Sequence, residues 1–159
     1  MSTINLKKYP KVKLTDFPSK IYHLKQISKL LGVEIYIKRD DLLPISGTIK
    51  SRGAIYEVLK YAEKLALEQG MLNNIHENYE VFASEEFRVF FSQYNLTVGT
   101  TGNLGISVGA MGRALGFQVT VHVSADAKQW KKAYLRERGV EVVEHATNFS
   151  KAVELGRAA

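Results

Sequence analysis

The pattern of apolar and polar residues along the chain predicts a regular succession of short strands and helices. Residues 33–38 alternate between apolar and polar side chains, which is typical of a strand. After residue 50, apolar residues recur at helical spacing with charged residues on the opposite side, and Gly70 ends this pattern. The same reasoning predicts helices over residues 21–31, 85–91, 103–115, 127–138 and 150–158, and strands over residues 97–99, 118–123 and 140–143.

Strands and helices that alternate in this way favour an α/β fold. We expect a three-layer, doubly wound parallel sheet with helices on both faces. The many glycines and alanines of the helix over residues 103–115 are expected to let this helix approach its neighbours closely. Residues 1–20 are expected to form an extended, basic lead-in, since Pro10 and Pro18 disfavour helix at the residues before them. Residues 21–159 then make up the α/β region.

Composition narrows the class of protein. A chain of 159 residues that is 45% hydrophobic can bury one core, so we expect a single domain. The absence of cysteine excludes disulfides and thiolate metal sites, and the four histidines lack the spacing of metal ligands, so we interpret them as structural. No stretch reaches the ~20 apolar residues of a membrane helix, and residues 1–13 contain no apolar leader. We therefore expect a cytoplasmic protein.

The positive charge is concentrated near the start of the chain. Residues 1–50 hold ten Lys and Arg against four Asp and Glu, whereas residues 51–159 hold twelve of each, and the net charge is +6. A basic arm can attract nucleic acid. No recognition motif follows it, however, so we expect no nucleic-acid partner and interpret the arm as solvated or attractive to anionic metabolites.

Lys50 is the first residue that suggests chemistry. It stands at the beginning of a predicted helix, in the string S-G-T-I-K-S-R-G over residues 46–53. The positive end of the helix dipole, together with partial burial, would lower the pKa of its amine and favour Schiff-base chemistry. On position alone, a solvated lysine at a helix start is the commoner alternative.

A second string, V-G-T-T-G-N-L-G over residues 98–105, follows an apolar run and opens another predicted helix. A strand-to-helix turn of this kind offers backbone N–H groups and a positive dipole end to an anion. A nucleotide-binding Rossmann domain is one alternative. The glycines of a Rossmann domain have a different spacing from the G-x-x-G-x-x-G of this chain, however. The next predicted strand also leads to Ser124, where a Rossmann domain has an acidic residue that binds the ribose.

In combination, the two strings resemble the D-serine dehydratase (D-serine ammonia-lyase) family of pyridoxal-phosphate enzymes, which have the tryptophan-synthase-β-like fold (fold type II). Leu104 favours the D-serine branch, since related lyases acting on L-amino acids usually carry histidine after the asparagine. Residues 17–41 are instead similar to D-cysteine desulfhydrase and aminocyclopropane-carboxylate deaminase, so threonine or a sulfur amino acid stays open as the substrate. The matching stretches are residues 43–70, 90–116 and 119–143, more than half of the chain.

The resemblance implies a role for each residue of the two strings. Lys50 would form the Schiff base with pyridoxal 5'-phosphate, and Asn103 would donate to the ring hydroxyl of this cofactor. Thr100, Thr101 and Gly102 would receive the carboxylate of the amino-acid substrate. The implied reaction is β-elimination of D-serine to pyruvate and ammonia. Capping of a helix is the alternative role for Asn103.

Two features of the family have no counterpart in this chain. The family holds the cofactor phosphate with a glycine-rich loop and contacts the pyridine nitrogen with a hydroxyl residue, both in its C-terminal half. The resemblance therefore implies an N-terminal fragment of a fold type II enzyme, whose missing half or a second chain completes the site. A catalytically silent remnant that acts as a binding module is the alternative.

Overall fold

The computed structural model describes residues 19–74, 79–100, 102–146 and 148–158. Apart from Ser19 and Lys20, the predicted lead-in over residues 1–20 lies outside the described residues. Within the described ranges, no helix is both long enough and apolar enough to cross a membrane.

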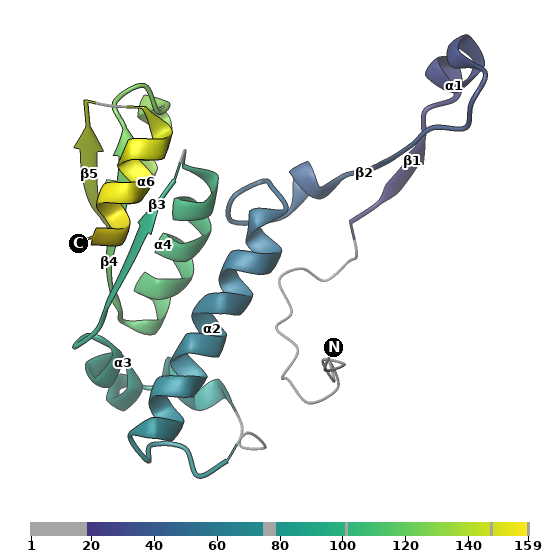
Figure 1. Cartoon of the computed structure of the whole chain (residues 1–159). Coiled ribbons are helices and arrows are strands. Elements are labelled where there is room, and N and C mark those ends of the chain that lie inside the picture. Colours follow the sequence, from purple (N-terminus) through teal and green to yellow (C-terminus); the bar gives the residue numbers. More distant parts are fainter. Residues whose placement is uncertain (1–18, 75–78, 101, 147, 159) are drawn as a thin grey trace, which may run out of the picture.

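A three-stranded parallel sheet forms the centre of the α/β region (Figure 1). The strands lie in the order β3-β4-β5, so that Val121 of the middle strand pairs with Val98 on one side and Val142 on the other. The helices that follow these strands begin close to where they were predicted. The elements are β3 (Asn95–Gly99), α4 (Asn103–Leu115), β4 (Gln118–Ser124), α5 (Gln129–Arg136), β5 (Glu141–His145) and α6 (Phe149–Ala158).

Helices cover both faces of this sheet, which confirms the predicted three-layer α/β architecture. Gly105 of α4 lies against Val121, whereas Gly156 of α6 lies against His122. Because successive strand residues point to opposite faces, α4 and α6 must pack on opposite sides. A Cβ added at Gly105 would meet Val121 at 2.7 Å, so the small residues of α4 do allow the close approach that was expected.

The longest helix, α2 (Lys50–Glu68), packs alongside α4, and Figure 1 shows that both helices start at the same end of the molecule. Its buried face joins an aromatic cluster from α3 (Glu85–Phe91), in which Phe91 stacks on Phe117 with ring centroids 4.6 Å apart. The hydroxyl of Ser84 caps α3 by accepting from the N–H of Phe87. Among the residues that the structure describes, two short 3-10 helices, Asp40–Leu42 and Tyr79–Ala83, complete the connections.

An arm extends away from the sheet at the start of the described chain (Figure 1). Its strands β1 (Ile21–His23) and β2 (Tyr36–Lys38) pair antiparallel, and α1 (Lys25–Leu31) lies between them. The predicted helix over residues 21–31 was therefore wrong for its first four residues, since α1 begins at Lys25 and residues 21–23 belong to β1. Those residues form backbone hydrogen bonds with β2, a partner that helical spacing does not reveal. The predicted strand over residues 33–38 shortens to β2, which belongs to this arm and not to the parallel sheet.

Candidate active site

Lys50 is the first residue of α2, and its side chain is exposed, so the partial burial expected from the sequence was wrong. The backbone N–H of Lys50 donates to Thr48 Oγ1 at 3.2 Å, so a threonine hydroxyl satisfies one of the free N–H groups at the start of this helix. The amine is thus carried by a helix start whose dipole is positive at this end.

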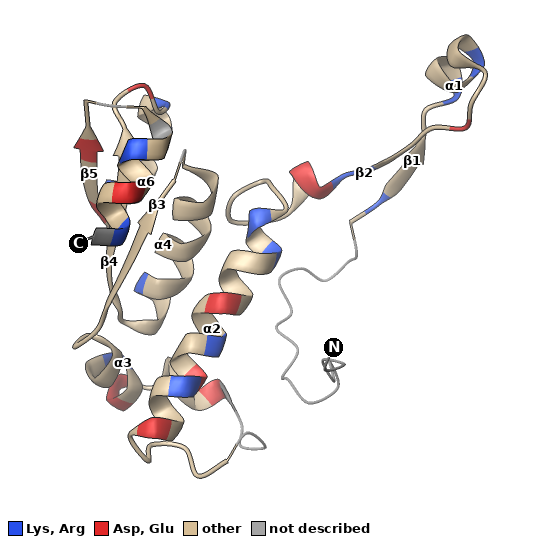
Figure 2. Cartoon of the chain, in the orientation of Figure 1, with Lys and Arg blue, Asp and Glu red and all other residues tan. Residues whose placement is uncertain are grey.

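A groove of about 610 Å³ runs between α2, β3 and α4, and Lys50 lies in its wall. Ligand pockets in proteins commonly measure about 300–1,000 Å³, so the groove has the size of a small-molecule site. Lys50 and Glu57 are the charged residues among those that line it. Figure 2 shows charged residues spread along α2, while α4 contributes only Arg113 among its residues. The other lining residues are Gly53, Ala54, Tyr56, Val58, Tyr61, Asn95, Leu96, Thr97, Val98, Leu104 and Val108.

The segment between β3 and α4 leads into the N-terminus of α4. Thr100 is 3% exposed, and its Oγ1 accepts a hydrogen bond of 3.0 Å from the N–H of Gly102. Gly102 has a φ of +125°, a conformation that is essentially restricted to glycine. Gly102 stands at the N-cap position, so Asn103 is the first helical residue and not the cap. Thr101 lies outside the described residues.

The structure brings the two predicted strings to the same end of the molecule. Lys50 begins α2 and Asn103 begins α4, and these helices pack side by side and start at the same end (Figure 1). Leu104, the next residue after Asn103, shares the groove with Lys50. Asn103 itself is half-buried and is not among the residues that line the groove. Two helix starts, each with a positive dipole end, therefore flank one groove.

A turn over residues 43–49 leads into Lys50, and no pattern in the sequence indicates its shape. Ile45 has a φ of +77° and Gly47 a φ of +58°. Ser51, which is 0% exposed, donates from Oγ to the carbonyl of Pro44 at 2.8 Å. The Oγ of Ser46 lies 2.8 Å from the Oγ of Ser51.

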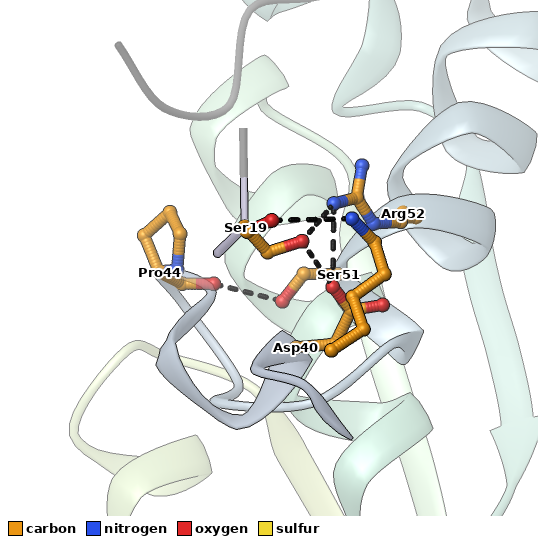
Figure 3. Close-up of polar contacts among 6 residues, drawn as sticks. Ser19, Asp40, Pro44, Ser51 and Arg52 are labelled. Carbon is orange, nitrogen blue, oxygen red and sulfur yellow. Dashed lines mark hydrogen bonds and ion pairs between the residues drawn. The ribbon is translucent and has the colours of Figure 1, made fainter. Parts of the chain in front are cut away.

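A polar cluster beside this turn joins the arm to α2 (Figure 3). Ser19 donates to Asp40, and Arg52 donates to Ser19 Oγ at 3.0 Å and to Asp40 at 3.4 Å. The hydroxyl of Ser19, helped by the Arg52 guanidinium, holds the pKa of the Asp40 carboxyl below its usual range. These contacts are typical of an ion pair that stabilises the fold. They hold the Arg52 guanidinium against the arm.

None of the three histidines that the structure describes, His23, His122 and His145, lines the groove. His122 Nδ1 and His145 Nε2 are 2.8 Å apart on the face of the sheet that α6 covers. Burial, and then the neighbouring His145, lower the pKa of His122. In the described part of the chain, no group of three or more His, Asp or Glu side chains could hold a metal ion.

Comparison with known proteins connects the chain to a cofactor. A family model described as pyridoxal-phosphate dependent enzyme matches residues 12–159. A probable D-serine dehydratase from Geobacillus kaustophilus is 62% identical over 124 residues, which are 78% of this chain and 28% of the relative. The D-serine dehydratase of Citrobacter koseri is 56% identical over 135 residues, or 85% of this chain and 30% of the relative. The chain thus spans about a third or less of the length of these relatives.

Solved structures with the same fold include ammonia lyases. Diaminopropionate ammonia lyase from Escherichia coli, in a complex with D-serine, matches with a TM-score of 0.71 at 18% sequence identity. This match covers 96% of the present chain and 36% of the lyase. A fungal L-serine ammonia-lyase from Rhizomucor miehei matches with a TM-score of 0.66 at 16% identity. At such identities, the likeness concerns the fold.

Proposed function

Because the chain belongs to the family of pyridoxal-phosphate-dependent enzymes, we propose that it is the lysine-bearing part of a D-serine dehydratase. Such an enzyme removes water from D-serine and adds water back as ammonia is released, so that the net products are pyruvate and ammonia. The observation that carries the proposal is the position of Lys50 in the wall of a groove that two helix starts flank. The names of relatives more than 50% identical over most of this chain support D-serine as the substrate. The family match also favours pyridoxal phosphate over the nicotinamide cofactor of a Rossmann domain.

Lys50 and Asn103 fit this cofactor in their chemistry. Lys50 offers a primary amine, the group that can bind an aldehyde covalently and exchangeably. Asn103, at the start of α4, offers a neutral amide that can donate to a ring oxygen without adding charge. When bound, pyridoxal 5'-phosphate would supply an electron sink for breaking bonds at the substrate's α-carbon. Lys50 would hold the cofactor, and its amine would also be able to carry a proton at the α-carbon.

The turn before α4 suits a carboxylate. Thr100 accepts from Gly102, but a hydroxyl that accepts one hydrogen bond can still donate another. The positive end of α4 favours an anion at the same place. We therefore assign Thr100, Gly102 and Thr101 to the carboxylate of the amino acid, with Thr101 outside the described residues.

The apolar walls of the groove would exclude water from the reacting atoms. Leu96, Val98, Leu104 and Val108 line it on the side that faces α2. Removal of water strengthens each charge interaction in the site and protects reactive intermediates from side reactions. The residues that hold the cofactor phosphate would come from the remaining part of the longer protein, since this chain spans about a third or less of its relatives. We place this chain in the cytoplasm on the basis of its own composition.

A chimera tests this function. The chain would be joined to the part of the Citrobacter koseri relative that lies beyond the matched 135 residues, and pyruvate release from D-serine would be measured with pyridoxal 5'-phosphate present. We expect release that Lys50→Ala abolishes and that the matched control Lys60→Ala, exposed on the same helix, leaves unchanged. L-serine and D-threonine serve as substrate controls. Unchanged activity of the Lys50→Ala chimera would refute the proposal.

A further inference from the structure

The turn before Lys50 contains a strained residue. Ile45 has a φ of +77°, a region that β-branched residues very rarely adopt. The N–H of Ser46 donates across this residue to the carbonyl of Pro44 at 3.0 Å, and the N–H of Gly47 donates to the carbonyl of Leu43 at 3.1 Å. Such a conformation persists only where surrounding contacts hold it, and these positions cluster at functional sites.

Ser51 provides the contacts that hold the turn. Its Oγ donates to the carbonyl of Pro44 at 2.8 Å (Figure 3). The same Oγ accepts from the N–H of Ser46 at 3.3 Å, so Ser51 holds the residues on both sides of Ile45. The side chain is fully buried, which removes water as a competitor. Tyr134 of α5 adds a hydrogen bond of 3.3 Å to the carbonyl of Ile45.

The hydrogen-bond directions in this turn follow from counting protons. A hydroxyl has one proton, and that of Ser51 goes to the Pro44 carbonyl, which can only accept. Ser46 must then donate to Ser51, at 2.8 Å, and Thr48 must donate to Ser46, at 3.0 Å. Thr48 in turn accepts from the backbone N–H of Lys50. One directed chain of hydroxyls therefore runs from the backbone of Lys50 to the turn, and Ser51 is its last hydroxyl.

We propose that Ser51 is a positioning residue for Lys50. By holding the strained turn against the first turn of α2, its hydroxyl fixes where the helix begins and how the Lys50 amine enters the groove. Ser51 itself is buried beneath the turn and is not among the residues that line the groove. The proposal rests on the proposed function, because it takes Lys50 as the residue that binds the cofactor.

Labelling of Lys50 in the 159-residue chain tests the proposal. The protein would be mixed with pyridoxal 5'-phosphate at increasing concentrations and reduced with borohydride, and the labelled peptides would be quantified by mass spectrometry. Ser51→Ala is expected to lower the labelling rate at Lys50 about tenfold, because a loosened turn no longer fixes the amine. Labelling of Lys60, exposed further along α2, is expected to stay unchanged. Ser28→Ala, which removes another buried serine hydroxyl that accepts from a backbone N–H, is the matched control.

A second substitution separates positioning from general loss of stability. Glycine adopts a positive φ without strain, so Ile45→Gly in the Ser51→Ala background is expected to restore most of the labelling. A readout without cofactor is the exchange of the backbone N–H groups of Ser46 and Lys50, which Ser51→Ala should accelerate about tenfold. If circular dichroism shows that Ser51→Ala is unfolded, Ser46→Ala breaks the same chain at a half-buried position and takes its place.

The outcomes distinguish the two claims. Normal labelling of Lys50 in Ser51→Ala, with labelling intact in the native chain, would overturn the positioning role and leave the proposed function standing. Absent labelling of Lys50 in the native chain would count against the proposed function, and amide exchange would then decide whether Ser51 holds the turn. Slower labelling without any rescue by Ile45→Gly would overturn the strained turn as the cause.

Discussion

Substitution of Gly102 by alanine tests the backbone geometry at the start of α4. Gly102 has a φ of +125°, which alanine rarely adopts and which costs about 1–3 kcal/mol for a residue other than glycine. An added Cβ would also meet Lys131 Cδ at 2.4 Å, but this atom belongs to a flexible side chain that can move aside. The strain at φ therefore dominates, and we expect it to lower the free energy of unfolding by about 2–3 kcal/mol, of which the stiffer unfolded chain of a Gly→Ala variant offsets about 0.4–1 kcal/mol.

Gly70 supplies the matched control, because it has a φ of +69° and no neighbouring atom within 4 Å of the place that a Cβ would take. Gly70→Ala costs about 1–2 kcal/mol for its left-handed backbone, and the stiffer unfolded chain offsets about 0.4–1 kcal/mol of this. In a chain of this size, 1 kcal/mol corresponds to about 2–4 °C in melting temperature. Thermal unfolding followed by circular dichroism should thus show Gly102→Ala about 2–10 °C below the native protein and below Gly70→Ala. Equal melting of Gly102→Ala and the native chain would refute the assigned backbone conformation.

Three further substitutions address the pH response, an ion pair and the cofactor. Burial and His145 lower the pKa of His122, so as the pH falls the unfolded chain takes up a proton near pH 6.5 before the folded chain does. The free energy of unfolding should therefore decrease as the pH drops through 6.5. Urea titrations at several pH values should show that this dependence is weaker in His122→Gln. Glu144→Gln leaves the buried Lys132 ammonium without its carboxylate and should lower the melting temperature more than the exposed control Arg136→Gln; an equal effect would contradict the pairing. Asn103→Ala should raise the concentration of pyridoxal 5'-phosphate for half-maximal labelling of Lys50 about tenfold, measured by peptide mapping.

Local patterns predicted the parts of the fold that local interactions determine. The helix over residues 103–115 was predicted to its ends, because a glycine-containing turn precedes it and Gly116 follows it in a left-handed conformation. The first strand of the arm was missed, because Ile21–His23 become a strand only through pairing with Tyr36–Lys38, which is a contact distant in sequence. A pattern within a short stretch of sequence cannot reveal such a pairing.

The residues of the candidate site likewise fall into those that a sequence pattern reveals and those that only the structure reveals. Lys50 and Asn103 could be found because each stands at a helix start inside a recognisable string. Ser51 could not, since its importance comes from burial and from the positive φ of Ile45, neither of which a sequence displays. Glu57 was also missed, because only the packing of α2 against β3 and α4 brings it into the groove.

The most direct test of the central claim is the identity of the lysine that binds the cofactor. The native chain would be incubated with pyridoxal 5'-phosphate, reduced with borohydride and digested, and the label at each lysine would be quantified by mass spectrometry. We predict that Lys50 is labelled at the lowest cofactor concentration and that Lys50→Arg removes this saturable label. Equal labelling of Lys50 and other exposed lysines such as Lys60 and Lys64, rising in proportion to the cofactor, would contradict the account.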